Sequence, residues 1–95
     1  MNKSVSESFM NSCRSGDTSS AMSQVERVGV NYQEVTGATG LMWAVFKGHN
    51  QLSLCLLSLP DIDVNTKSHK LGTALHWAVA AKNVDMIKIK IPLRL

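Results

Sequence analysis

The segment Thr73–Ala80 reads TALHWAVA, and a closely similar octet, TGLMWAVF, occupies Thr39–Phe46. Threonine, leucine, tryptophan, alanine and valine recur at the same five places, with an offset of 34 residues (73 minus 39). Repetition at one fixed spacing predicts a repeat architecture, in which each copy forms one small structural unit. His76 of the later octet is replaced by Met42 in the earlier one, so we interpret this histidine as scaffold rather than as a catalytic group.

A weaker third copy lies upstream of the two octets. Gly48, which follows the middle octet, corresponds to Lys82 in the last copy and to Gly16 in the N-terminal segment. The sequence VGVN, ending at Asn31, corresponds to IDVN, ending at Asn65. A glycine at the position of Gly48 suits a left-handed turn that ends a helix.

Each copy has the pattern of two short helices. Thr39 and Thr73 stand directly before apolar runs, where a hydroxyl can accept a backbone N–H as a helix N-cap. Leu41, Ala44 and Val45 fall at i, i+3 and i+4, which places them on one face of a helix. The small alanine on that face lets a neighbouring helix approach closely.

A short helix pair cannot bury its apolar face alone, but stacked pairs share one continuous core. We therefore predict an all-α solenoid of about three helix-loop-helix units joined by short hairpin-like loops. The expected single domain has an N-terminal capping repeat at 4–31, which opens with the capping-box spacing of Ser4–Glu7. A middle repeat at 32–65 and a last, truncated or atypical repeat at 66–95 follow.

These segments resemble ankyrin repeats. EVTGAT (34–39) is similar to the entry hairpin of that family, with glutamate in place of aspartate, and DIDVN (61–65) is similar to its exit loop. The stretches 39–52 and 73–86 are similar to its helical parts. The resemblance implies an ankyrin-type fold, a role in protein–protein interaction as a scaffold or adaptor, no enzymatic activity, and no metal or other cofactor.

The sequence departs from the family pattern at several places. Gly40 and Ala74 replace the proline that opens the first helix, and Leu71 replaces the hairpin glycine, so we expect a less regular second hairpin. The last nine residues, 87–95, read IKIKIPLRL. Their apolar residues alternate with a period near two, and Pro92 disfavours a helix there. An exposed apolar side in this segment would be either an aggregation hazard or a docking surface.

Residues that could carry chemistry are better explained by structure. The histidines and Cys55 lack the short paired spacing of zinc ligands. Cys13 and Cys55 are expected to be free thiols that fill space in the core. Asp61 and Asp63 lie where a turn is expected, so a role as paired catalytic carboxylates is disfavoured.

Trp43 and Trp77 recur at one place in the repeat, which allows two interpretations. One is packing between repeats, which we favour, and the other is a pair of aromatic contacts for a ligand.

Composition narrows the class of protein further. Hydrophobic residues make up 44% of the 95 residues, aromatic residues 5%, and the net charge is +3. The cations are spread along the chain, so binding to nucleic acid is disfavoured. No apolar run approaches the roughly 20 residues of a membrane-spanning helix, and no signal peptide is recognisable. We expect a cytoplasmic or nuclear protein that neither binds a membrane nor takes a small-molecule substrate.

The residues that differ between copies are the candidate contacts with a partner protein. Phe46 is the best candidate, because its counterpart Ala80 shows that the fold does not require a large side chain there. Lys47, Lys67 and Lys70 favour an acidic partner. By the family's pattern, the contact positions fall on Val35, Thr36, Ala38, Phe46, Lys47, His69, Lys70, Ala80 and Ala81.

Two other classes of function stay open at this point. The chain could be a truncated or regulatory fragment of a longer ankyrin-repeat protein, which would unfold with low cooperativity and aggregate in isolation. Alternatively, it could bind nucleic acid weakly through its scattered lysines, with an affinity that falls steeply with salt.

Overall fold

The computed structural model describes residues 2–89, and these residues form six α-helices with no extended strand. In chain order the helices are α1 (Asn2–Ser15), α2 (Thr18–Val28), α3 (Gly40–Phe46), α4 (Asn50–Leu57), α5 (Ala74–Ala80) and α6 (Val84–Ile89). The all-α prediction is confirmed. Within the described residues there is a single isolated β-bridge, which pairs Ser68 with Gly72 at the neck of the second hairpin.

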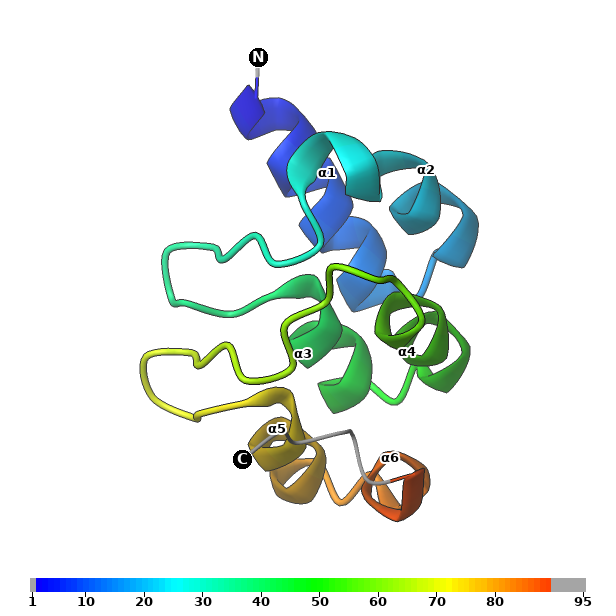
Figure 1. Cartoon of the computed structure of the whole chain (residues 1–95), viewed down its shortest axis with the longest axis vertical. Helices are drawn as coiled ribbons and strands as arrows, with labels where there is room; N and C mark the ends of the chain where they lie inside the picture. Colours follow the sequence, from blue (N-terminus) through cyan, green and yellow to red (C-terminus); the bar gives the residue numbers. More distant parts are fainter. Residues whose placement is uncertain (1, 90–95) are drawn as a thin grey trace.

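The helices stack in pairs along the long axis of the molecule (Figure 1). Helices α1, α3 and α5 form one row, in which α3 packs against both α1 and α5. Helices α2, α4 and α6 lie beside their partners in a second row, and α2 also contacts α4. The loops before α3 and before α5 project to the same side of the stack, next to the first row (Figure 1). This is the arrangement of a solenoid built from helix pairs.

Threonines stand at the N-cap of the first helix in the middle and last pairs, as the sequence predicts. The Thr39 hydroxyl accepts a hydrogen bond from the backbone N–H of Met42 at 3.3 Å, and Thr73 occupies the N-cap of α5. The prediction for the N-terminus was wrong, because α1 starts at Asn2 and Ser4 therefore lies inside the helix. A serine hydroxyl can cap only where the residue itself is not helical.

The core runs without a break through the three helix pairs. Phe9 and Cys13 of α1, Val45 of α3 and Ala78 of α5 are fully buried. Gly40, which stands where the family has proline, lies against this core. A Cβ atom on Gly40 would come within 2.7 Å of the Cys13 sulfur, so only glycine lets α3 approach α1 this closely.

The turns between paired helices share a left-handed residue. Gly16 has φ +80° and Gly48 has φ +79°, while Lys82 holds the same place in the last turn with φ +56°. A side chain makes this conformation costly, by roughly 1–2 kcal/mol for a residue with a Cβ atom. The turn of the last pair is therefore strained relative to the other two.

The C-terminal segment is described only as far as Ile89. Residues 87–89 belong to α6 and are helical, so the period-two pattern does not produce an extended chain there. Residues 90–95, which include Pro92, lie outside the described residues.

We predict that Lys82→Gly stabilises the protein. Glycine adopts the left-handed turn without steric cost, and this gain exceeds its larger loss of backbone entropy, for a net of about 0.5–1 kcal/mol. Thermal unfolding followed by circular dichroism should show a higher melting temperature for this variant. The matched change Gly48→Lys should lower it, and a fall for Lys82→Gly would contradict the account.

Candidate interaction surface

Three aromatic side chains of the first helix row form one cluster. The ring centroids of Trp43 and Trp77 are 5.2 Å apart, in an edge-to-face arrangement. Phe46 packs edge-on against both, at 6.2 Å from Trp43 and 5.6 Å from Trp77. Edge-to-face pairs at these separations are favourable beyond simple burial. The two tryptophans therefore connect the middle repeat with the last, which confirms the interpretation of packing between repeats.

Each tryptophan is also hydrogen-bonded to the hairpin that precedes its helix. The indole N–H of Trp43 donates to Glu34 Oε2 at 3.1 Å, and that of Trp77 donates to Ser68 Oγ at 3.1 Å. Acceptor and donor are nine residues apart in both repeats. The same contact thus recurs with two different acceptors, and it fixes each hairpin to the helix beside it.

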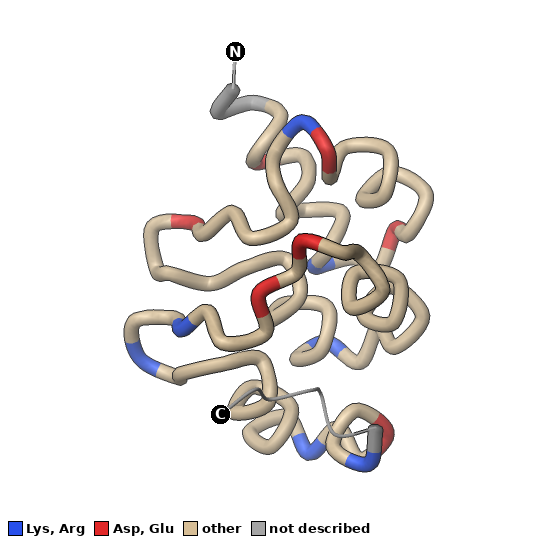
Figure 2. The backbone as a smooth tube through the Cα atoms, viewed as in Figure 1, with Lys and Arg blue, Asp and Glu red and all other residues tan. Residues whose placement is uncertain are grey.

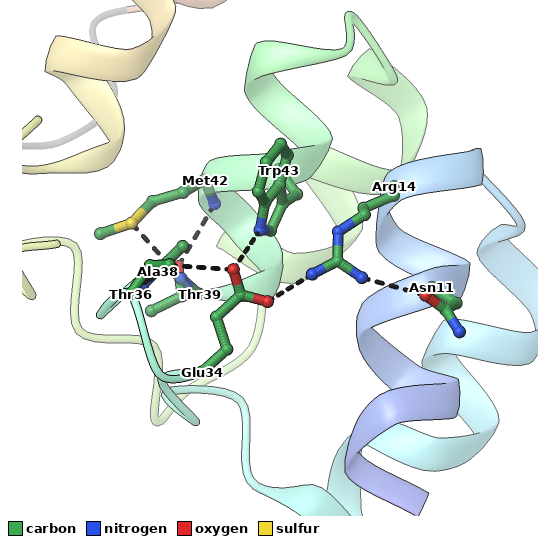
Figure 3. A network of polar contacts seen from close by, with 8 residues as sticks. All are labelled: Asn11, Arg14, Glu34, Thr36, Ala38, Thr39, Met42 and Trp43. Carbon is green, nitrogen blue, oxygen red and sulfur yellow. Dashed lines mark hydrogen bonds and ion pairs between the residues drawn. The ribbon is translucent and has the colours of Figure 1, made fainter.

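Glu34 is the centre of a polar network that joins the first and middle repeats (Figure 3). Its carboxylate forms an ion pair with Arg14 of α1 and accepts a hydrogen bond from the Thr36 hydroxyl at 2.9 Å. The guanidinium of Arg14 also lies 5.0 Å from the ring centroid of Trp43, within the range of a cation–π contact. One carboxylate therefore holds α1, the first hairpin and α3 together.

The two hairpins lie against each other. The backbone N–H of His69 donates to the Thr36 carbonyl at 3.0 Å, and the Gln33 amide donates to the Lys67 carbonyl at 3.0 Å. A Cβ atom on Gly37 would meet the His69 ring at 2.7 Å, so the close approach needs glycine there. In the second hairpin the left-handed residue has moved by one position, to Gly72 (φ +80°). The two hairpins therefore differ in shape, as the replacement at Leu71 predicts.

Most of the proposed contact residues are accessible on this side of the molecule. Val35 is 92% exposed and Phe46 is 39% exposed, and Ala81 is half-buried. The exposed members of the rest of the set are Thr36, Lys47, His69, Lys70 and Ala80.

Ala38 is a correction to that set. Its side chain is fully buried, so the expectation that it contacts a partner is wrong. The cause is the geometry of the hairpin neck, where the Ala38 carbonyl accepts a hydrogen bond from the backbone N–H of Glu34 at 2.9 Å. The strand-like neck turns the methyl group into the core directly before Thr39.

Three residues that organise this surface, Arg14, Glu34 and Ser68, are not among the contact residues that the sequence predicts. A signal was present, because Glu34 precedes Trp43 by the same nine residues that separate Ser68 from Trp77. Glutamate and serine share no chemistry except a hydrogen-bond acceptor. Comparing the copies by residue identity therefore hides the correspondence.

His76 and Met42 have the same structural role. The backbone N–H of Thr73 donates to His76 Nδ1 at 3.0 Å, and that of Thr39 lies 3.3 Å from the Met42 sulfur. Each side chain returns to the N-cap of its own helix, as in a capping box. The histidine thus closes the corner between hairpin and helix, which agrees with the scaffold interpretation.

The remaining candidates for chemistry have structural surroundings too. Burial raises the pKa of the Cys13 thiol to about 12, so it is not ionised at neutral pH. Cys55 is half-buried, and both thiols are free. Asp63 accepts a hydrogen bond from the Asn65 N–H at 2.9 Å within its own turn. Within residues 2–89 no three histidine, cysteine or acidic side chains gather as metal ligands would.

Charge is distributed unevenly along the stack (Figure 2). From residue 67 to residue 89 there are four lysines and one acidic residue, Asp85. These lysines lie on the second hairpin and on the last helix pair, whereas all the acidic residues except Asp85 precede the second hairpin, on the first helix pair, the first hairpin and the loop after α4. The four are Lys67, Lys70, Lys82 and Lys88.

Stacked pairs of short helices, joined by hairpins on one side, define a helical repeat solenoid. A family model described as ankyrin repeats, in three copies, matches residues 9–89. The chain belongs to the ankyrin-repeat family. Ankyrin repeats are modules for protein–protein interaction, and as a family they are a binding fold rather than a catalytic one.

Several curated proteins are similar to part of the chain. Inversin from Mus musculus is 39% identical over 57 residues, which is 59% of this chain and 5% of that protein. Inversin from Gallus gallus is 37% identical over 57 residues, also 5% of its length, and inversin from Danio rerio is 37% identical over 57 residues, 6% of its length. The chain therefore spans only a small part of these relatives.

No described helix has both the length and the apolar character needed to cross a membrane.

We predict that Glu34→Ala destabilises the protein by about 1–2 kcal/mol, because it leaves the Trp43 indole N–H and the Arg14 guanidinium without their acceptor. Glu34→Gln should cost less, since the amide oxygen can still accept from the indole. Urea unfolding of both variants tests this ranking. Equal losses would show that the ion pair, and not the bond to Trp43, carries the effect.

Proposed function

We propose that this chain binds another protein through the side of the solenoid formed by the two hairpins and the first helix row. We define this interaction surface by Phe46, Lys47, Thr36, His69 and Lys70. It acts as a scaffold for recognition, without catalysis. The observation that carries the proposal is the partly exposed ring of Phe46, which sits on a rigid base of two tryptophans.

The position of Phe46 suits an anchor for a partner. The ring is held from two sides, so little conformational freedom is lost when a partner covers it. Its counterpart Ala80 is exposed, which shows that this place in the repeat can be filled without a large apolar side chain. Aromatic residues held in this way dominate the binding energy of many interfaces.

A hollow near the hairpins adds shape to the same surface. It has a volume of about 550 Å³ and is mostly apolar, and its lining includes Leu71 and Trp77. The exposed side chains of His69 and Lys70 stand at its edge. An apolar side chain from a partner fits such a hollow, with polar groups at the rim to orient it.

The lysines support an acidic partner. Lys47 lies beside Phe46, and Lys67 and Lys70 lie on the second hairpin, all of them exposed. Complementary charge at the rim of an interface speeds association and helps to select the partner. We therefore propose that the partner carries an acidic segment with at least one exposed apolar side chain.

Phe46→Ala should weaken binding to the partner by roughly 30-fold, the loss typical of a hot-spot residue. The matched control is Leu54→Ala, which removes a similarly exposed apolar side chain (43%) from α4 in the other helix row. Quantitative mass spectrometry after affinity capture should show proteins lost with the first variant and kept with the second. Their affinities can then be measured by titration.

Helicity should be unchanged in both variants by circular dichroism. If Leu54→Ala reduces capture as much as Phe46→Ala does, the surface assignment is wrong. Loss of helicity in Phe46→Ala would show instead that this ring belongs to the core.

Replacing Lys47, Lys67 and Lys70 together with glutamine should lower the association rate with the captured partner and flatten its dependence on salt. Arg27→Gln, on the first helix pair, removes a similarly exposed cation far from this surface and should leave the rate unchanged. Titration with single-stranded and double-stranded DNA at low and high salt tests the alternative function, binding to nucleic acid. That function predicts an affinity for DNA that falls steeply as the salt concentration rises.

A further inference from the structure

A second hollow, with a volume of about 450 Å³, lies between the first and middle repeats. One wall is the end of α2 with the chain that follows it, and the other wall is the loop after α4. The volume is within the range of pockets that take small ligands. None of the lining residues belongs to the interaction surface defined above. We call it the inter-repeat hollow and define it by Val25, Glu26, residues 29–32 and residues 59–61.

Hydrogen bonds fix the two walls of the hollow to each other. The Asn31 amide nitrogen donates to the Asp61 carbonyl at 2.8 Å, and the Asn31 side-chain oxygen accepts from the backbone N–H of Asp63 at 2.8 Å. Within the first wall, the backbone N–H of Tyr32 donates to the Gly29 carbonyl at 3.1 Å. A site whose walls are already held in place loses little conformational freedom when a ligand enters.

The lining of the hollow is mostly apolar. Val25 is buried, and Val30, Tyr32 and Leu59 are half-buried and pack against the core. A Cβ atom on Gly29 would meet no other atom within 4 Å, so the space beside this glycine is open. The hollow can therefore cover the apolar stem of a long side chain, with an aromatic ring among its contacts.

The charged groups that line the hollow are all acidic. Glu26 comes from one wall and Asp61 from the other, and both side chains are exposed. Neither carboxylate forms a hydrogen bond or an ion pair with another described residue. Arg27 is next to Glu26 in the chain, but it does not line the hollow. Helices α2 and α4 both end within two residues of lining residues, and the C-terminus of a helix carries partial negative charge.

We propose that the inter-repeat hollow binds an arginine side chain from a basic segment of a partner protein. The stem of the arginine lies against the apolar lining, and its guanidinium faces Glu26 and Asp61. The Tyr32 ring supplies a surface for a cation–π contact. A guanidinium suits this place better than an ammonium group, because it is planar, less strongly hydrated, and has enough donors for two carboxylates. The interaction surface favours an acidic partner instead, so the two sites can be tested separately.

Nuclear magnetic resonance of the ¹⁵N-labelled full chain tests this site. The probe is acetyl-arginine amide, and the control probe is acetyl-citrulline amide, which has a neutral group of nearly the same shape. We expect the backbone amide signals of residues 29–32 to shift with the arginine probe and to saturate, with a dissociation constant on the order of 1 mM. The citrulline probe should bind at least about fivefold more weakly, because it lacks the charge.

A pair of charge variants tests the two carboxylates. Glu26→Gln with Asp61→Asn should weaken binding of the arginine probe by about fivefold or more. Both changes keep the size of the side chain, and the Asp61 carbonyl can still accept from Asn31. The matched control is Glu7→Gln with Asp85→Asn, which removes the same charge from α1 and α6 and should leave the affinity unchanged.

Three results would overturn the proposal. The first is the absence of saturable shifts at residues 29–32, and the second is equal binding of the two probes. The third is an equal loss of affinity in both charge variants, because general attraction to an acidic chain would then explain the binding. Analytical ultracentrifugation examines a different occupant. Self-association of the unmodified chain that Glu26→Gln with Asp61→Asn abolishes would assign the hollow to a second copy, against the proposed partner.

Discussion

Helices of six to eight residues are too short to be stable in water by themselves, and α3, α4, α5 and α6 are all of that length. Their existence depends on the apolar face that each pair shares with the next. Fully buried alanines at Ala44 and Ala78 keep the helix axes close, and the larger Val45 fills the space between them. Stability in this fold is therefore a property of the contact between neighbours rather than of any one unit.

Polar contacts across the same boundaries satisfy backbone groups that stacking would otherwise leave unpaired. His49 donates from Nε2 to the Arg14 carbonyl at 2.8 Å, and the Asn83 amide donates to the Val45 carbonyl at 2.8 Å. Asn31 does the same at the other side of the stack, where its amide group bonds to backbone atoms of Asp61 and Asp63, each at 2.8 Å. A buried carbonyl without a partner would cost about as much as a lost hydrogen bond. These side chains therefore fix the register in which the units stack.

The repeated octets were enough to predict the helix pairs, the threonine caps and the packing role of the tryptophans. Each of these depends on residues that are identical in both copies. The features that escaped depend on geometry shared by different residues. Ala38 lies in the neck of a hairpin, and no periodicity in the sequence shows that this neck turns its side chain into the core. Glu34 and Ser68 accept the same kind of bond with different groups. Lys82 takes a left-handed turn that its residue type disfavours, and only the alignment with Gly48 points to it.

The pairing of Met42 with His76 has a wider consequence. The Met42 sulfur and the His76 ring nitrogen each lie close to the backbone N–H of the N-cap threonine of their own helix. The junction between hairpin and helix therefore requires only an acceptor three residues after that threonine. Unlike residues can be exchanged at this joint while the path of the main chain is kept. Repeats built in this way can differ in sequence and still stack. The fold requires a hydrogen-bond acceptor at this position, and more than one residue type can supply it.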